Sequence, residues 1–228
     1  MKGMRIVQVT DIHLRRFWSG GYDRLIRILE ADPPELLLIT GDFVDGKLDH
    51  RPALPVLQRL IPQLRAKRGI YGITGNHDGD LIRARLGSLG VRFIEHQFVR
   101  VPIDDGGEIE LVGLPGVKRY DFDPDFVANV PPRRSGVPRL ILGHYPDFVR
   151  FVAPLEADAM FVGHTHGGQI CLPNGYPPLT HDALPHRMAR GVHQFGKTKL
   201  FVNRGFGTTR WPIRLFCPAE VIEIRLGG

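Results

Sequence analysis

Seven short apolar runs constrain the fold of this chain more than any other feature of its sequence. Each run is rich in Val, Ile and Leu, which is typical of a strand, and each ends in polar or glycine-containing residues; the runs cover residues 5–10, 36–40, 69–74, 109–113, 139–142, 159–162 and 200–203. Runs this short cannot be told from buried helix by periodicity alone. Their nearly continuous hydrophobicity favours strands in sheets that are covered on both faces.

Helical spacing appears between the apolar runs. Within residues 22–31, apolar side chains recur at spacings of three and four, at Leu25, Ile26, Ile28 and Leu29. The segment Asp32-Pro33-Pro34 then stops the helix. Residues 53–64 and 80–89 have a similar pattern. The first part of the chain therefore alternates strand and helix, which is typical of an α/β layered fold.

Length and composition favour one globular domain. The 228 residues are enough to bury a large core, and core-like runs resume after each segment rich in Pro and Gly, so we predict a single domain over residues 1-228. No apolar segment approaches the about 20 residues that span a bilayer. Cys171 and Cys217 are too few for a disulfide framework. We expect a cytoplasmic location, with peripheral contact at the inner membrane face as a further prediction.

The net charge of +6 favours anionic partners, because a surplus of positive charge attracts phosphates or anionic lipid over long range. Two segments, Arg15-Arg16-Phe17-Trp18 and residues 210–216, mix cations with large apolar groups. Such mixtures suit an anionic membrane surface, but the same side chains would serve equally well as anchors in the core. The sequence leaves both orientations open.

Side chains with useful chemistry follow five of the seven runs: Asp11 and His13, then Asp42, then Asn76, His77 and Asp78, then His144, and finally His164 and His166. In open α/β folds the carboxyl ends of strands meet at one rim, where ligand sites are built. Carboxylate oxygens and imidazole nitrogens bind divalent cations such as Mn²⁺, Fe²⁺ or Zn²⁺, whereas the lack of a nearby cysteine argues against a thiolate site. The sequence therefore predicts a metal site with mixed oxygen and nitrogen ligands.

The five blocks occur in the order D-x-H, G-D, G-N-H-D, G-H and G-H-x-H, and with them the sequence resembles the calcineurin-like metallophosphoesterase family. The motifs span residues 4 to 170. The resemblance implies a four-layer α/β/β/α sandwich with two central mixed β-sheets and a metal site at the carboxyl ends of strands. The runs G-H-T-H-G-G-Q and N-R-G-F-G resemble a bacterial branch that includes membrane-associated phosphodiesterases and lipid pyrophosphatases.

Carried over residue by residue, the resemblance implies two divalent metal ions per chain, with Mn²⁺ expected and Fe²⁺ or Zn²⁺ as alternatives. Asp11, His13 and His166 would hold one ion, Asn76, His144 and His164 the other, and Asp42 would bridge them. His77 would act beside the scissile phosphate, and Asp78 would orient its imidazole. A metal-bridging water or hydroxide would then attack a phosphodiester or pyrophosphate bond.

The substrate stays open at this stage. The bacterial branch implies a phosphate ester that is lipid-linked. The alternatives are a phosphomonoesterase on the same dinuclear centre, a catalytically silent metal-binding scaffold, and a nuclease that only the net basicity favours. No specific nucleic acid or protein partner is predicted.

Several further polar residues have two interpretations. Arg204, beside two glycines, either contacts the substrate phosphate or belongs to a plain glycine turn. Asp45 is interpreted as a loop or helix-capping residue, with a distal metal ligand as the alternative, and Gln169 is a candidate substrate contact. We interpret the histidines outside the motifs as structural or surface residues: His50, His96, His181, His186 and His193.

Overall fold

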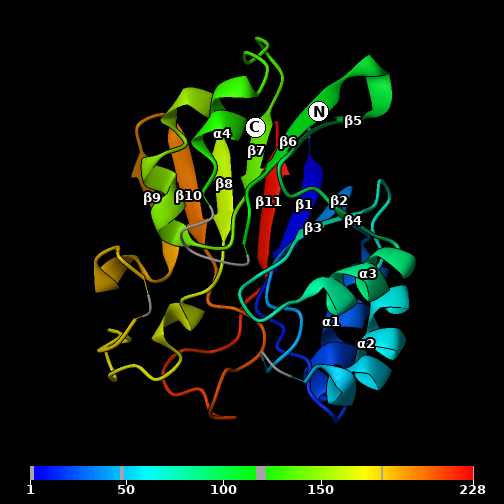
Figure 1. Cartoon of the computed structure of the whole chain (residues 1–228), viewed down its shortest axis with the longest axis vertical. Coiled ribbons are helices and arrows are strands. Elements are labelled where there is room, and N and C mark those ends of the chain that lie inside the picture. Colours follow the sequence, from blue (N-terminus) through cyan, green and yellow to red (C-terminus); the bar gives the residue numbers. More distant parts are fainter. Residues whose placement is uncertain (1–2, 47–48, 117–121, 181, 228) are drawn as a thin grey trace.

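The computed structural model describes residues 3–46, 49–116, 122–180 and 182–227. Its first sheet has the strand order β11-β1-β2-β3-β4, formed by β1 (Met4–Val9), β2 (Leu36–Thr40), β3 (Ile70–Ile73), β4 (Val91–Phe93) and β11 (Ile222–Leu226). Strands β1 to β4 run parallel, and β11 adds to β1 in the antiparallel direction. The first and the last strand of the chain thus lie side by side in this sheet (Figure 1).

The second sheet has the order β5-β6-β7-β8-β10-β9, formed by β5 (Gln97–Pro102), β6 (Glu108–Gly113), β7 (Arg139–Leu142), β8 (Ala159–Val162), β9 (Gly191–Phe195) and β10 (Thr198–Val202). Its central strands are parallel, whereas β5 and β9 pair in the antiparallel direction at the two edges. Both sheets are therefore mixed, as the resemblance implied.

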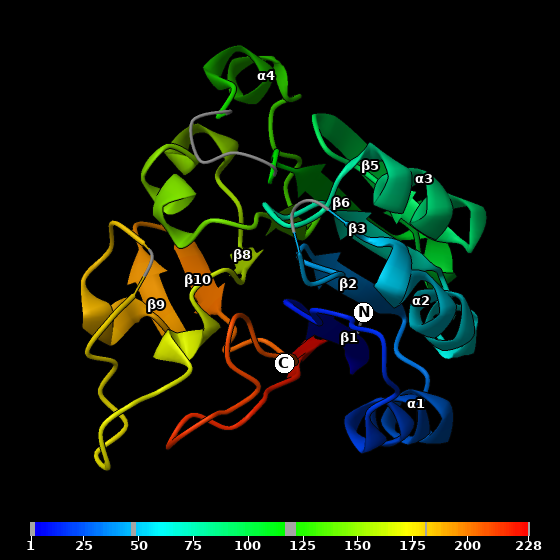
Figure 2. The ribbon, with the colours of Figure 1, turned by 60° about the horizontal axis from the view of Figure 1, so that its bottom comes forward.

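Helices cover the outer face of each sheet (Figures 1 and 2). The first sheet is covered by α1 (Gly20–Ala31), α2 (Leu54–Leu60) and α3 (Asp80–Ser88), and the second by α4 (Pro124–Asn129) with short 3-10 helices at Pro146–Arg150 and Ala153–Leu155. Helix α1 begins where the Ser19 side chain accepts a hydrogen bond from the Gly21 amide, an N-cap that satisfies a free backbone donor. The predicted four-layer α/β/β/α arrangement is confirmed.

Alternate side chains of the central strands enter different cores. In β2, Leu36 and Leu38 lie between the two sheets, whereas Leu37 and Ile39 pack against the helices. Successive strand side chains point to opposite faces, so a strand covered on both faces is apolar throughout. This is why the seven apolar runs correspond to strands β1, β2, β3, β6, β7, β8 and β10.

The structure also contains elements that the sequence patterns did not predict: strands β4, β5, β9 and β11 and helix α4. Strand β9 is largely exposed and β11 alternates between half-buried and exposed residues, so neither has an apolar run. The helix predicted at 53–64 is shorter than expected, because α2 is flanked by 3-10 turns at Arg51–Ala53 and Ile61–Gln63. Each turn contains a proline, which lacks the N–H that a regular α-helix needs.

One rim of the molecule collects the carboxyl ends of the central strands from both sheets, at the lower end in Figure 1. The sheets meet there through the His144 ring, whose Nδ1 lies 2.8 Å from the Thr40 carbonyl oxygen at the end of β2. Within the described ranges, no helix has the length and apolarity needed to cross a membrane.

Candidate metal centre

The loops at this rim hold their backbone in an unusual conformation. Five of the candidate metal ligands have positive φ angles: Asp11 (49°), His13 (45°), Asp42 (51°), His164 (69°) and His166 (52°). Such angles are uncommon for residues with a Cβ and persist where the surrounding structure enforces them. Here the loops hold one another, because the Asp11 amide donates to the Gly41 carbonyl and the His13 amide to the Asp42 carbonyl, both at 3.0 Å.

Two glycines allow these loops to approach the carboxylates. A Cβ on Gly75 would lie 2.2 Å from Asp42 Oδ1, and one on Gly163 would lie 2.1 Å from Asp11 Oδ2. Either contact would force the carboxylate away. The glycines of the G-N-H-D and G-H-x-H blocks are therefore required sterically, because only a residue without a side chain fits beside these carboxylates.

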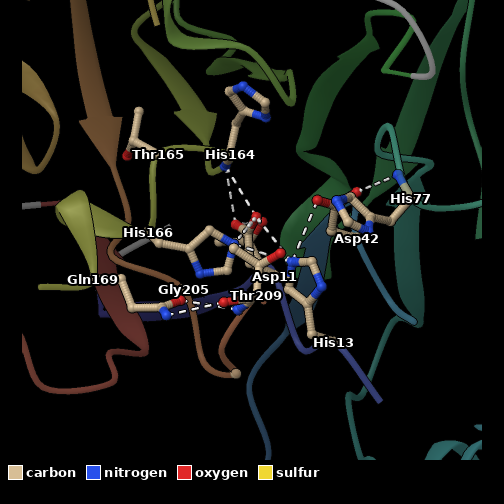
Figure 3. Close-up of polar contacts among 12 residues, drawn as sticks. Asp11, His13, Asp42, His77, His164, Thr165, His166, Gln169, Gly205 and Thr209 are labelled. Carbon is tan, nitrogen blue, oxygen red and sulfur yellow. Dashed lines mark hydrogen bonds and ion pairs between the residues drawn. The ribbon is translucent and has the colours of Figure 1, made fainter. Parts of the chain in front are cut away.

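The first cluster consists of Asp11, His13, Asp42 and His166, all buried, with one ligand atom from each lying within 4.8 Å of the others. The Nε2 atoms of His13 and His166 lie 3.0 Å apart. His13 Nε2 is 3.4 Å from Asp42 Oδ2, and His166 Nε2 is 3.4 Å from Asp11 Oδ1 (Figure 3). Two ring nitrogens that converge with two carboxylate oxygens form a donor set that fits a divalent cation.

The second cluster consists of Asn76, His144 and His164. Asn76 Oδ1 lies 3.1 Å from His144 Nε2 and 2.9 Å from His164 Nδ1. An amide oxygen and two imidazole nitrogens therefore converge on one point. Asp42 joins this cluster as well, because its Oδ2 lies 3.5 Å from His144 Nε2. The same oxygen thus contacts a histidine of each cluster.

Neighbouring groups set the orientation of the histidine rings. His144 Nδ1 faces the Thr40 carbonyl oxygen, which can only accept a hydrogen bond, so this nitrogen carries the proton and Nε2 is left to bind a cation. His13 Nδ1 lies 3.3 Å from Asp45 Oδ1. A carboxylate or carbonyl on the far ring nitrogen is the usual partner of a metal-binding histidine. Asp45, interpreted from the sequence as a loop or capping residue, therefore contacts a ring of the first cluster.

His77 lies beside the first cluster. Its backbone amide donates to Asp42 Oδ1 at 2.8 Å, and its ring packs edge-on against the His13 ring with centroids 4.8 Å apart. His77 Nδ1 is 4.0 Å from Asp45 Oδ1, and its side chain is 17% exposed. The ring thus borders the buried carboxylates and also reaches solvent.

Asp78 contacts the backbone of two loops. Its carboxylate accepts hydrogen bonds from the amides of Phe43 (2.9 Å), Val44 (3.3 Å) and Gly75 (2.9 Å). These bonds tie the loop after β3 to the loop after β2, and they hold Asp42 and His77 side by side. Burial, with the Asp42 charge, raises the pKa of Asp78 to about 7. The predicted orientation of the His77 ring by Asp78 stays a prediction.

The buried carboxylates raise the pKa values of His13 and His144, and these two histidines lower the pKa of Asp42. Burial alone would lower the pKa of His13, but hydrogen bonds to Asp42 and Asp45 raise it to about 10. Burial likewise opposes protonation of His144, whose pKa the Asp42 carboxylate raises to about 9. The pKa of Asp42 is held well below its usual value by these two histidines, against the effect of burial. A cation that binds here must therefore displace protons.

The remaining predicted residues lie around this centre. Arg204 Nε is 2.7 Å from Glu220 Oε2, so its guanidinium is paired within the protein. Gln169 binds the backbone of Thr209 and Trp211 through three hydrogen bonds of 2.9 to 3.0 Å, which makes it a clamp for the C-terminal loop. The substrate contact predicted for Arg204 stays a prediction.

Of the histidines outside the motifs, His50 contacts the site, since its Nε2 lies 3.0 Å from the His77 carbonyl oxygen. His193 lies on β9, and its Nε2 is 2.8 Å from the carbonyl oxygen of Arg190, which precedes the strand. His181 lies outside the described residues.

Comparisons with known proteins concern the family and the fold. A model of the calcineurin-like phosphoesterase family matches residues 4–168. The phosphodiesterase YaeI of Escherichia coli (strain K12) is 28% identical over 231 residues, which cover 97% of this chain and 82% of that protein. The UDP-2,3-diacylglucosamine pyrophosphatase LpxG of Chlamydia muridarum (strain MoPn / Nigg) is 25% identical over 285 residues, covering 99% of this chain and 84% of that protein.

Among solved structures, TT1561 of Thermus thermophilus superposes with a TM-score of 0.55 at 8% identity, covering 89% of this chain and 90% of the other. At so low an identity the likeness concerns the fold alone.

Proposed function

The chain belongs to the calcineurin-like phosphoesterase family, and on this basis we propose that it hydrolyses a phosphodiester or pyrophosphate bond at a centre of two divalent cations. Membership of the family makes it a metal-dependent hydrolase of phosphoric esters. The number of cations, their identity and the residues that hold them are part of the proposal.

The position of Asp42 is the observation that carries this proposal. Asp42 Oδ2 lies 3.4 Å from His13 Nε2 in the first cluster and 3.5 Å from His144 Nε2 in the second. A carboxylate shared in this way suits a bridge between two cations. We propose that Asp11, His13, Asp42 and His166 hold one ion and that Asp42, Asn76, His144 and His164 hold the other, with Mn²⁺ the expected ion and Fe²⁺ or Zn²⁺ the alternatives.

The residues of the chain would share the chemistry as follows. When bound, two cations lower the pKa of water and stabilise the charge of an in-line phosphoryl displacement. Asp45 holds the His13 ring by its far nitrogen, and Thr40 does so for His144. His77 is the half-buried imidazole next to the first cluster, so we assign it the proton that the leaving group needs.

Two relatives support the class of bond. YaeI is a phosphodiesterase and LpxG a UDP-2,3-diacylglucosamine pyrophosphatase, and each aligns with nearly the whole chain. We propose by this likeness that the ester is lipid-linked. Exposed apolar side chains near the rim, Phe17, Trp211, Ile213 and Phe216, support a peripheral contact with an anionic membrane. The cytoplasmic location and the single domain over residues 1-228 stay predictions.

A panel of esters would test the proposed function. Protein stripped with a chelator and reloaded with Mn²⁺ is offered bis-p-nitrophenyl phosphate, p-nitrophenyl phosphate and a nucleotide-sugar pyrophosphate. We expect metal-dependent hydrolysis of the diester or the pyrophosphate at a higher kcat/KM than of the monoester. Preference for the monoester would establish the phosphomonoesterase alternative. Two bound cations without hydrolysis of any ester would establish the silent scaffold.

A further inference from the structure

A cavity of about 850 Å³ lies beside the first cluster. One wall is formed by the loop after β1 and by helix α1, and the other by the C-terminal loop at residues 206–221. These segments lie far apart in the sequence but side by side along the lower rim, where α1 and the C-terminal loop are seen in Figure 2. The volume falls within the roughly 300–1,000 Å³ that is typical of small-molecule sites.

Large apolar side chains make up much of the lining. They include Phe17, Trp18, Tyr22, Leu25, Ile28 and Phe206. The rings form a continuous wall, since Trp18 packs edge-on against Tyr22 with centroids 5.4 Å apart and Tyr22 stacks on Phe206 at 6.1 Å. Phe17 is 75% exposed and Ile28 is 38% exposed, so part of this apolar surface still faces solvent.

Several polar side chains in the lining have partners within the protein. Trp18 Nε1 donates to Asp23 at 3.0 Å, and Glu220 pairs with Arg204 at 2.7 Å. Arg15 pairs with Asp45 at 2.8 Å and donates to the Thr208 carbonyl at 3.0 Å. A polar ligand would have to compete with these bonds, whereas a hydrocarbon group would leave them intact and lose its contact with water.

The cavity also borders the candidate metal centre. His13 belongs to its lining and to the first cluster. Arg214 belongs to the lining as well, and its guanidinium donates to the carbonyls of Gly207 (2.9 Å) and His166 (3.2 Å). Of the candidate ligands, His13 alone lines the cavity, so an ester substituent of a phosphate held at the clusters would have to extend past His13 to reach it.

We propose that this cavity binds the hydrocarbon arm of an amphiphilic phosphoester substrate while the metal centre holds its phosphate. This inference rests on the proposed function, and it specifies which part of the molecule selects the substrate. Each methylene that leaves water on binding contributes up to about a fourfold gain in affinity, so the gain should grow with chain length until the cavity is filled.

A homologous series tests the proposal. The full chain loaded with Mn²⁺ is assayed with p-nitrophenyl alkyl phosphates from methyl to decyl, each below its critical micelle concentration. We expect kcat/KM to rise by about two- to fourfold per added methylene and then to level off. Equal kcat/KM for all chain lengths would overturn the proposal. A gain that appears only above the critical micelle concentration would also overturn it, in favour of a surface contact with aggregates.

A pair of neighbouring glycines offers matched variants. A Cβ on Gly21 would point at the Phe206 ring, 3.4 Å away, whereas one on Gly20 would meet nothing within 4 Å. We expect Gly21→Leu to narrow the cavity and reduce the gain with chain length, with kcat/KM for the methyl ester unchanged. Gly20→Leu adds the same side chain outside the lining and should keep the gain. Equal behaviour of the two variants would contradict the assignment.

Ile28→Gln provides a second variant in case Gly21→Leu does not fold. It makes one partly exposed wall residue polar and should reduce the gain for long chains, while Leu81→Gln, at an exposed apolar position on α3 outside the lining, should not. Retention of the full gain in Ile28→Gln would count against the cavity.

Binding without turnover separates this inference from the proposed function. Calorimetry with alkyl phosphates of increasing length reports the apolar contact whether or not the protein hydrolyses an ester. Affinity that rises with chain length more steeply in the parent than in Gly21→Leu, together with no hydrolysis of any ester, would reject the proposed function and keep the cavity assignment. Hydrolysis of the methyl ester with no dependence of affinity on length would do the reverse.

Discussion

The two clusters at the rim differ in charge and in burial. The first contains two carboxylates, Asp11 and Asp42, with two imidazoles, and all four residues are buried. The second adds an amide oxygen and two imidazoles, and its Asn76 and His164 are half-buried. The second cluster contacts a carboxylate through Asp42, whose Oδ2 lies 3.5 Å from His144 Nε2.

This difference in charge and burial predicts which of the two clusters binds its cation more tightly. Two negative charges in a buried site attract a divalent cation more strongly than one shared charge does, so we expect the first cluster to hold its ion more tightly. The second cluster depends on Asp42 for its negative charge and is more open to solvent.

Removing the shared carboxylate should have the largest effect. Asp42→Asn takes away the charge that both clusters use, so metal content and activity should fall together, with kcat reduced by more than about 10⁴, the upper figure for loss of a positioned proton donor. Metal analysis and kinetics on the same preparation check this. Near-normal content of both ions in the variant would contradict the role of Asp42 as a bridge.

His77 should matter for proton transfer and not for the clusters. We expect His77→Ala to keep near-normal metal content and to lose roughly 10²–10⁴ in rate on an ester with an alkoxide leaving group. The loss should shrink on a p-nitrophenyl ester, whose leaving group scarcely needs a proton. His193→Ala, on the edge strand β9, is the control. Equal losses on both esters would instead indicate that His77 stabilises the phosphate charge.

The metal-free protein should lose stability as the pH rises. The pKa values of His13 and His144 are raised to about 10 and about 9 in the folded chain, above the unfolded value of about 6.5. Their contribution is therefore fully present below pH 6.5 and is lost as the pH rises through 9 to 10. Urea unfolding with a chelator present should show a decrease on the order of 5 kcal/mol between pH 7 and pH 9. An unchanged or rising free energy of unfolding would show that the rings are neutral.

Replacement of Asp45 should have the smallest of these effects, and it should weaken metal binding at the first cluster alone. Asp45→Asn weakens the partner of His13 Nδ1 without touching the second cluster, so affinity for the tighter ion should fall by about 10–100-fold. Titration with Mn²⁺ after chelation would measure it. Asp49→Asn, at an exposed carboxylate paired with Arg51, should leave both affinities unchanged. An equal loss in the two variants would mean that net charge, and not ring orientation, causes the effect.

The sequence patterns located the polar side chains that meet at the rim, because buried strands have a distinctive composition. Strands β1, β2, β3, β7 and β8 are buried along nearly their whole length, so a polar residue at the end of each stands out. Edge strands such as β9 and β11 alternate or face solvent, and their sequences resemble loops.

The position of Asp45 could not be predicted, because it depends on the positive φ angles of His13 and Asp42 and on the parallel bridge between Leu14 and Val44 that sets the two loops side by side. The rule that a metal-binding histidine needs a partner for its second nitrogen is the signal that could have pointed toward such a carboxylate. The cavity could not be predicted from the sequence either, because its walls come from segments at opposite ends of the chain.

The pairing of two cations across Asp42 is tested most directly by electron paramagnetic resonance of Mn²⁺-loaded protein, with the metal content measured on the same sample. We predict two Mn²⁺ per chain with the spectrum of an exchange-coupled pair, and loss of the coupling in Asp42→Asn. A fully active sample with one ion per chain, or with two ions that show no coupling, would contradict the shared centre.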